Sequence, residues 1–527
     1  MLDLAPRSSR HALALLVAFA SAVALLVSEH GSAAAGPSPA TSGSPADLLT
    51  LARGPAAASP ETIGACAPAE REKGVARFGF AHFGDLHARY GELLGGHSRY
   101  GYIAGFLKQL KEARPTLVLD AGGDYERGSL AEVRSSGEAT RQLVQALPID
   151  ARTIGRSDFA YGETAVLRDA RLSRHPVLAA NVMHADLPAS AQPFRPYARF
   201  DVGCAKVGVI GLVTQGAGAD GRPTKAPYDG VFVHDDRYPA ILEREAKAHR
   251  AEVDVLVALT HLGQAEDLAL ARGGGKLVDL VVGAGSDDRL AAPVVVRHPD
   301  GTKTWVMQVG PFGQALGRGE VVVKLGAART IAIEGYGVVD IDEALPHASE
   351  VSDLARRIED AVAPDAHASI GRLSAPVERR AVSELVWRAA AATWRVDAMV
   401  VGRDLGQAKL PKGDVTLQRL YDAVLGQRQP AGTAGSSSIW IAELGGAEMS
   451  AIARVFRPGT TYDWFGPRSK FDPTRRYRLA LDKRAATNPK VLFGPESRSL
   501  RPALVGEAID ALESYARARA ARGQSID

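Results

Sequence analysis

Short runs of nearly continuous apolar residues alternate with amphipathic stretches from Phe78 to about Asp340. The runs include FGFAHFG, TLVLDAGG, KVGVIGLV, DVLVALTHLG and LVDLVVGAG, and the stretches between them include YIAGFLKQLKEA and ILEREAKAHRAE. Strands without polar alternation belong to sheets covered on both faces. The pattern therefore predicts a layered α/β domain. An antiparallel strand pair around WVMQVG and GRGEVVVKL, followed by TIAIEGYGVV, is expected to close it.

A second, smaller unit follows this domain. The segment EVSDLARRIEDAVAPDAH predicts a helical linker within residues 346–375, and an α+β unit is expected over residues 376–527. A chain of 527 residues is also too long for one ordinary core. We therefore predict two globular domains, the first spanning residues 77–345.

The N-terminus has the composition of an export signal. Arg7 and Arg10 precede the apolar run ALALLVAFASAVALLV, and the small residues SAAAG offer a cleavage site near Ala35. Residues 1–35 are predicted to be a signal peptide, with an uncleaved membrane anchor as the alternative. An Ala-, Pro- and Ser-rich flexible lead over residues 36–76 follows. We expect a periplasmic or extracellular protein.

The chain has two cysteines, Cys66 and Cys204. In an oxidising compartment such a pair forms one bridge that fastens the lead to the main body. Two unpaired buried thiols are the other interpretation, and both stay open at the level of sequence. A zinc site built on thiolates is excluded in practice.

The net charge of the chain argues against some classes of binding partner. The 63 basic and 60 acidic residues give a net charge of +3, which is small for this length. The composition thus lacks the basic footprint of a nucleic-acid-binding protein or of a protein bound to anionic lipid. A small-molecule ligand is the expectation, and the oligomeric state stays open.

Acidic and histidine residues stand where the predicted strands end. They are Asp85 and His87 in GDLH, Asp124 in LDAGGD, His261 in ALTHLG and Asp287 in VVGAGSDD. The carboxyl ends of strands carry the functional loops of open α/β sheets. Carboxylates and imidazoles that converge there suit a divalent metal. Each residue taken alone is better explained as a capping aspartate or a solvated histidine, so the prediction rests on their common placement.

These motifs make the chain after residue 77 resemble the exported 5'-nucleotidase and cyclic-nucleotide phosphodiesterase family of calcineurin-like metallophosphoesterases. FAHFGDLHARY resembles the family's first metal-binding block, and VLDAGGDYERGS resembles the second, with Asp124 as the bridging aspartate and one extra glycine. PVLAANV, KVGVIGLVT and DVLVALTHLGQAEDLALA resemble its middle strands. The resemblance implies a four-layer metallophosphoesterase α/β sandwich, a separate C-terminal nucleotide-binding domain, and metal-dependent hydrolysis of nucleotide-type phosphate esters.

Two blocks depart from the family pattern. TIGRSDFAYG stands where the family has Gly-Asn-His followed by an acid, so that Arg156 and Ser157 replace the asparagine and the histidine. VVGAGSDDRL stands where the family has Gly-His-Ser-His, so that Gly285 and Asp287 replace two histidines. The first metal site would keep Asp85, His87, Asp124 and Asp287. The second would draw on Asp124, Arg156, His261 and Gly285, two of which cannot bind a cation. We therefore expect one ion of Zn, Mn or Mg.

Catalysis must change if one metal and the family's histidine are gone. Arg156 is predicted to stand in for the missing charge, either by bridging Asp124 or by holding a phosphate bidentately. Asp158 or His261 would supply the proton. Loss of a general acid costs about 10²- to 10⁴-fold in rate, so weak or altered activity is expected. The alternative is a catalytically inactive binding or scaffold protein.

The C-terminal unit also departs from the family pattern. VDAMVVGRDLGQAKLPKGDVTLQRLYDAV resembles the family block that presents an asparagine and an arginine to the nucleotide, but Gly402 takes the asparagine position and Arg403 is the nearest arginine. Family members stack the base between two aromatic rings. The candidate rings are Tyr462, Trp464, Phe465 and Phe471. Of these, Trp464 and Phe465 are predicted to bind the substrate together with Arg403 and Arg156.

Overall fold

The computed structural model describes residues 61–125, 128–214, 231–273, 277–326, 329–424, 437–457 and 461–527. All of them belong to one compact unit. The predicted signal peptide and most of the lead lie outside these residues. Within the described ranges, no helix has the length and apolar character needed to cross a membrane.

The first sheet has six strands in the order β17-β16-β2-β5-β6-β7. Strands β2, β5, β6 and β7 are mutually parallel, and β16 and β17 add to the edge in antiparallel fashion. The four parallel strands are buried on both faces, as their apolar sequences predict. Their bounds are β2 (Val75–Phe83), β5 (Thr116–Asp120), β6 (Ala151–Thr153), β7 (Val177–Leu178), β16 (Ala315–Lys324) and β17 (Thr330–Asp340).

The second sheet has seven strands in the order β1-β9-β10-β12-β13-β15-β14. Its centre, β10 to β15, is parallel, and β9 and β14 pair in antiparallel fashion with their neighbours β10 and β15. The bounds are β1 (Glu61–Ile63), β9 (Tyr197–Val202), β10 (Ala205–Val213), β12 (Val255–His261), β13 (Leu280–Gly283), β14 (Val294–Arg297) and β15 (Lys303–Met307). The expected pairing of WVMQVG with GRGEVVVKL is wrong, because β15 and β16 lie in different sheets.

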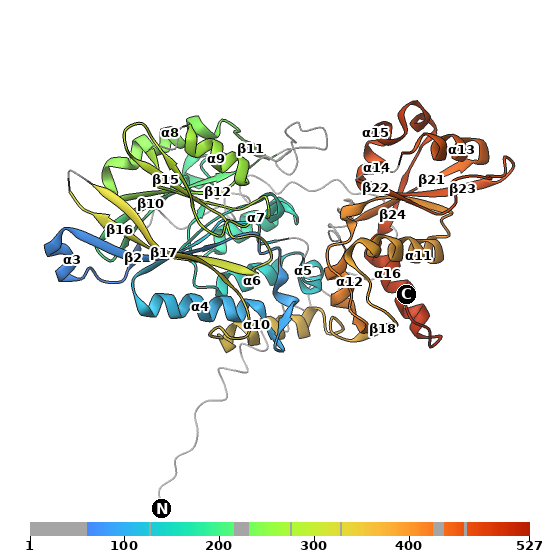
Figure 1. Cartoon of the computed structure of the whole chain (residues 1–527), viewed down its shortest axis with the longest axis horizontal. Coiled ribbons are helices and arrows are strands. Elements are labelled where there is room, and N and C mark those ends of the chain that lie inside the picture. Colours follow the sequence, from blue (N-terminus) through green and yellow to red (C-terminus); the bar gives the residue numbers. More distant parts are fainter. Residues whose placement is uncertain are drawn as a thin grey trace, which may run out of the picture. The chain divides into compact units, whose positions relative to one another are not determined.

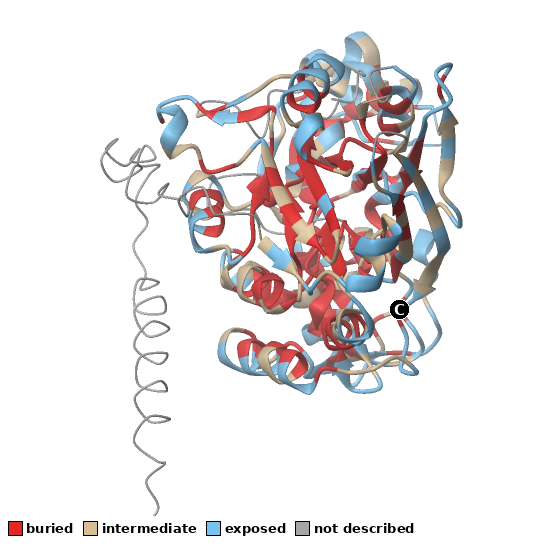
Figure 2. Ribbon diagram, turned by 90° about the vertical axis from the view of Figure 1, so that its left-hand side faces the viewer, coloured by how far each residue is buried: buried red, intermediate tan, exposed pale blue. Residues whose placement is uncertain are grey.

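The two sheets pack face to face. Phe78, Phe80 and Leu117 of the first sheet share one buried core with Val207 and Val257 of the second. Helices cover the outer faces: α4 (Arg99–Ala113) and α6 (Glu138–Ala146) on the first sheet, with α10 (Ser349–Val362) packed against these two helices, and α8 (Tyr238–His249) and α9 (Gln264–Arg272) on the second sheet (Figure 1). Figure 2 shows the buried residues concentrated in the strands between these helices. The predicted four-layer α/β sandwich is confirmed.

The C-terminal unit is α+β, as expected. Its sheet has the order β22-β19-β23-β21-β24. Helices α11 (Val382–Trp394) and α16 (Ala508–Ala520) pack on one side of this sheet, and α13 (Gly446–Val455) packs on the other. The strands are β19 (Ala398–Gly402), β21 (Ser438–Gly445), β22 (Tyr462–Phe465), β23 (Arg476–Asp482) and β24 (Ala503–Glu507).

Short elements complete the fold. The helices are α3 (Pro68–Lys73), α5 (Leu130–Arg134), α7 (Glu163–Leu172), α12 (Leu417–Ala423), α14 (Lys483–Thr487) and α15 (Pro489–Phe493), and the strands are β3 (Leu93–Leu94), β4 (His97–Ser98), β8 (Val182–His184), β11 (Phe232–His234), β18 (Ser369–Leu373) and β20 (Gly413–Thr416). Single 3₁₀ turns include Arg156–Phe159, which follows β6, and Arg403–Leu405, which follows β19.

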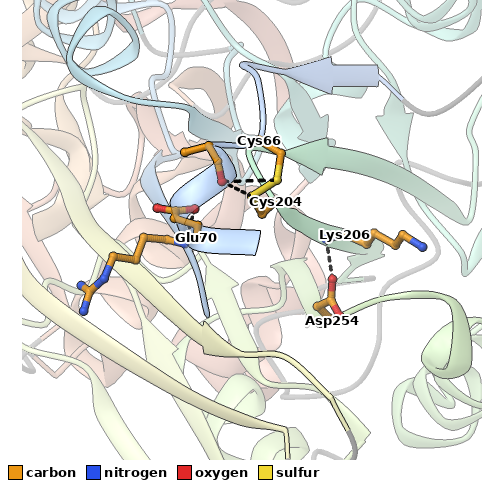
Figure 3. Close-up of a disulfide and its surroundings, with 7 residues drawn as sticks. Cys66, Glu70, Cys204, Lys206 and Asp254 are labelled. Carbon is orange, nitrogen blue, oxygen red and sulfur yellow. Dashed lines mark hydrogen bonds between the residues drawn. A yellow bond between two sulfur atoms is a disulfide. The ribbon is translucent and has the colours of Figure 1, made fainter. Parts of the chain in front are cut away.

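A disulfide joins Cys66 to Cys204 (Figure 3). The bond resolves the alternative that the sequence left open. It fastens the segment of β1 and α3 to the turn between β9 and β10, next to the parallel pairing of β1 with β9. Helix α3 contributes no buried residue, so the bond and this pairing are the main attachments of that segment.

Candidate functional site

Three side chains at strand ends face one another. Asp85 and His87 follow β2, and Asp287 follows β13 on the other sheet. The Nε2 atom of His87 lies 3.7 Å from Oδ1 of Asp85 and 3.8 Å from Oδ1 of Asp287. Ligand atoms in a tetrahedral zinc shell, with bonds of about 2.1 Å, are about 3.4 Å apart. The two distances from His87 are therefore close to those of a metal shell, and all three ligand atoms lie within 4.8 Å of one another.

No other such group exists in the part of the chain that the structure describes. Of its histidines, cysteines and carboxylates, only Asp85, His87 and Asp287 form a set of three with all ligand atoms within 4.8 Å. All three have left-handed backbones, with φ of 51°, 47° and 59°. Non-glycine residues held in this region cost about 1–3 kcal/mol each and cluster at functional sites.

Hydrogen bonds fix the orientation of the first two residues. The backbone N–H of Gly285 donates to Oδ2 of Asp85 at 2.7 Å, which leaves Oδ1 for the cation side. The backbone N–H of Phe312 donates to the Asp85 carbonyl at 2.6 Å. Nδ1 of His87 lies 3.3 Å from the Tyr125 carbonyl, so that nitrogen carries the proton and Nε2 keeps its lone pair. This is the usual support of a metal-bound histidine.

His261, the last residue of β12, approaches Asp85 from the other side. Its Nε2 lies 3.6 Å from Oδ1 of Asp85, and its Nδ1 lies 2.8 Å from the Ala121 carbonyl. Two glycines make room for the ring: a Cβ on Gly155 would stand 2.6 Å from Nε2, and one on Gly285 would stand 3.2 Å away. The space beside Nε2 thus depends on glycine at both positions.

A buried polar chain supports the loop that carries Asp287. Oγ of Ser286 donates to Gln308 at 3.1 Å, Nε2 of Gln308 donates to Asp267 at 2.7 Å, and Thr260 donates to the other oxygen of Asp267 at 2.6 Å. Burial raises the pKa of Asp267 to about 7. The sequence analysis did not identify Asp267 or Gln308. The signal available for Asp267 was an acidic residue in the first turn of the helix after β12.

Asp124 does not join the three-residue group. Its carboxylate is fully buried, and the guanidinium of Arg152 on β6 lies 2.9 Å from its Oδ2. Burial raises the pKa of Asp124 and raises that of the neighbouring Asp120 to about 6. The arginine that lies on Asp124 is therefore Arg152, in place of the Arg156 of our sequence-based prediction. The only signal for Arg152 was a lone cation in the short strand before the TIGRSDF loop.

Arg156 and Asp158 occupy opposite environments in the 3₁₀ turn after β6. Asp158 is buried: its Oδ1 lies 2.5 Å from Arg152, and its Oδ2 accepts the backbone N–H of Gly155 at 2.8 Å and of Gly123 at 3.0 Å. Arg156 is exposed, and it has no hydrogen bond or ion pair with any other described residue. Asp158 thus organises the loop, whereas Arg156 is available to an anion from solution.

The C-terminal candidates make contacts within their own unit. Arg403 binds Asp463 at 2.8 Å. Trp464 packs on Phe456, with ring centroids 5.6 Å apart, and its Nε1 donates to the Pro467 carbonyl at 3.1 Å. Phe465 stacks on Trp387, with centroids 6.0 Å apart.

Comparison with known proteins places this geometry in context. No family model matches the sequence. An apyrase of Tabanus yao is 23% identical over 53% of this chain and 54% of its own length. The protein UshA of Yersinia enterocolitica is 24% identical over 48% of this chain and 50% of its own length. The chain thus spans about half the length of these curated relatives.

Solved structures agree over more of the chain. The 5'-nucleotidase precursor of Thermus thermophilus superposes with a TM-score of 0.64 at 21% identity, over 84% of this chain and 96% of that one. The 5'-nucleotidase of Candida albicans gives 0.61 at 10% identity, over 84% and 98%.

The two-sheet sandwich joined to a smaller α+β unit is thus the fold of these two 5'-nucleotidase structures. In sequence, the chain is similar to an apyrase and to UshA over about half of its length.

Proposed function

We propose that the chain is an exported, metal-dependent phosphohydrolase that acts on nucleotide-type phosphate esters with one divalent ion. The observation that carries the proposal is the arrangement of Asp85, His87 and Asp287. Nε2 of His87 lies 3.7 Å from Oδ1 of Asp85 and 3.8 Å from Oδ1 of Asp287. The relatives called apyrase and 5'-nucleotidase supply the substrate class. Zn, Mn and Mg are the ions to test.

The residues divide the work at the site. A divalent cation held by the three residues would supply Lewis-acid polarisation of a phosphate ester. His261 presents an Nε2 with a lone pair beside Asp85, which suits it to hold or move a proton. Arg156 offers an exposed guanidinium whose fork geometry matches phosphate oxygens. The buried Asp158 keeps the loop that carries Arg156 in place.

Recognition of the nucleoside is assigned to the C-terminal unit. We propose that Arg403 binds the substrate and that Trp464 and Phe465 offer aromatic surface to the base, as the family resemblance implies. Both rings are partly exposed as well as stacked on neighbours. Base stacking on such a ring is worth about 1–3 kcal/mol.

Export is supported by the disulfide. Such bonds persist in oxidising compartments and are rare in the cytosol, and Cys66–Cys204 joins residues 138 positions apart. Together with the N-terminal apolar run, this supports a periplasmic or extracellular enzyme, with residues 1–35 removed or kept as an anchor.

The test measures metal and turnover on the same preparations. Purified protein is analysed for bound metal by elemental mass spectrometry, and phosphate release is followed on a nucleotide panel with Mn²⁺, Zn²⁺ or Mg²⁺. Asp85→Ala removes the central ligand, and Asp353→Ala, a half-exposed carboxylate paired with Arg356 on α10, is the matched control.

We expect about one ion per chain and metal-dependent phosphate release in the wild type and the control. Both should be lost in Asp85→Ala. A wild type that binds no metal and releases no phosphate would refute the proposal and leave a binding protein as the function.

A further inference from the structure

Arg152 is the largest side chain that is fully buried in the described part of the protein. It belongs to β6, and three carboxylates surround its guanidinium. One terminal nitrogen lies 2.9 Å from Asp124 and 2.5 Å from Asp158, and the other lies 2.7 Å from Asp169. A buried charge is tolerated only when it is paired in this way.

The position of this cation matters because Asp124 is the residue that two metal ions would have to share. Its Oδ2 lies 2.9 Å from the guanidinium as an ion pair, and neither of its oxygens has a hydrogen-bond partner among the described residues. Arg152 is therefore its charge partner. A guanidinium stays protonated at every accessible pH, so this partner cannot be removed by titration.

The other residues needed for a second ion are also missing. Position 285 is a glycine, which offers no side-chain donor, and Arg156 at the next loop is a cation. His261 alone faces the space beside Asp85 from that side. A second divalent ion would therefore have one imidazole and a shared carboxylate that is already paired with Arg152.

We propose that Arg152 takes the place of a second metal ion, with Asp124 as its counter-ion, so that the protein binds one divalent ion rather than two. The inference deepens the proposed single-metal function and rests on it for the first ion. It assigns Asp124 to Arg152 and excludes it from the metal shell. Arg152 is a positioning residue, because it acts through Asp158, which in turn holds Gly155 next to His261.

The first test compares two isosteric substitutions in the full-length holoprotein. Asp124→Asn removes the negative charge that faces Arg152. Asp85→Asn removes the negative charge of Asp85 from the group of Asp85, His87 and Asp287. Bound Mn²⁺ is titrated by electron paramagnetic resonance, and zinc per chain is measured after gel filtration. Thermal unfolding is recorded in parallel.

The inference predicts one equivalent of metal in the wild type. Asp124→Asn should keep that equivalent with a Kd within about threefold of the wild type, while its Tm falls by about 5 °C because Arg152 loses a partner. Asp85→Asn should weaken binding by at least about tenfold. Two equivalents in the wild type, or a tenfold loss of affinity in Asp124→Asn, would overturn the inference.

The second test asks whether Arg152 acts as a cation. Arg152→Met leaves buried carboxylates without their partner, so added Mn²⁺ should raise the Tm of this variant by several degrees more than it raises that of the wild type. Equal rises would contradict the substitution of a metal by the guanidinium. The first test uses the wild type and does not depend on this variant.

These outcomes separate the inference from the proposed function. Two bound ions with phosphate release would overturn the role of Arg152 and leave the hydrolase proposal intact. One bound ion without phosphate release from any nucleotide would support the role of Arg152 and refute the hydrolase.

Discussion

His82 offers a test of how burial controls stability in this fold. It lies in β2, three residues before Asp85, and it is completely buried. Its ring packs beside those of Phe80 and Tyr336, with centroids 6.2 and 6.0 Å away, and its Nε2 lies 3.0 Å from the Tyr336 hydroxyl. Burial lowers the pKa of His82 from 6.5 to about 3.

The sign and size of the effect follow from this shift. Above pH 6.5 the imidazole is neutral in the folded and unfolded chains, and it contributes no pH dependence. Below pH 6.5 the unfolded chain takes up a proton that the folded protein excludes until about pH 3. The free energy of unfolding therefore falls by about 1.4 kcal/mol for each pH unit below 6.5. Between pH 7.5 and 5.5 the expected loss is about 1.4 kcal/mol.

The perturbation is His82→Phe, which keeps an aromatic ring in the stack and cannot take up a proton. Urea unfolding is measured at pH 7.5 and 5.5 in EDTA, so that metal binding does not contribute. The loss of stability between the two pH values should be about 1.4 kcal/mol smaller in His82→Phe than in the wild type. The lost bond to Tyr336, worth about 1 kcal/mol, is the same at both pH values and cancels.

The comparison also cancels the other titrating groups, among them the buried Asp267, whose raised pKa acts in the opposite direction. If wild type and His82→Phe lose the same free energy between pH 7.5 and 5.5, the neutral buried state of His82 is refuted.

Two further predictions concern the site and the lead. Gly155→Ala would place a Cβ 2.6 Å from Nε2 of His261, so the ring must move and kcat for phosphate release should fall about 100-fold, whereas an unchanged kcat would show that this nitrogen takes no part. Reducing Cys66–Cys204, which closes a loop of 138 residues, should lower the free energy of unfolding by up to about 5 kcal/mol on the chain-entropy account; equal urea midpoints with and without reductant would contradict that account.

The sheets could be predicted because their signal is local. The parallel strands are buried on both faces, so most of them are continuous apolar runs that are visible without their neighbours; β6, which carries the buried Arg152, is the exception. The placement of Asp85, His87 and Asp287 follows from the same rule, since the carboxyl ends of parallel strands meet on one edge. Nothing in the sequence, however, shows the left-handed backbones that turn these three side chains together.

The two failures have a common cause, because both depend on contacts between distant segments. The runs that form β15 and β16 are adjacent in sequence and have similar apolar patterns. Between them, however, the chain crosses from one sheet to the other. At this crossing the backbone N–H of Phe312 donates to the Asp85 carbonyl. The partner of Asp124 could not be predicted either. Arg152 and Arg156 lie close together in the sequence, and only the folded structure decides which of the two side chains points inward.

The two arginines divide between them the tasks that a second metal ion would perform. A metal shared through Asp124 would neutralise that carboxylate and would also present positive charge to the substrate. Here the neutralising charge is Arg152, which is buried and bound to Asp124, and the charge open to an anion is Arg156, which is exposed. Asp158 connects the two, since it binds Arg152 and holds the first residue of the loop that carries Arg156. Because a guanidinium is a fixed donor and cannot acidify water, this division preserves phosphate binding better than it preserves water activation, which is the physical reason to expect slow turnover.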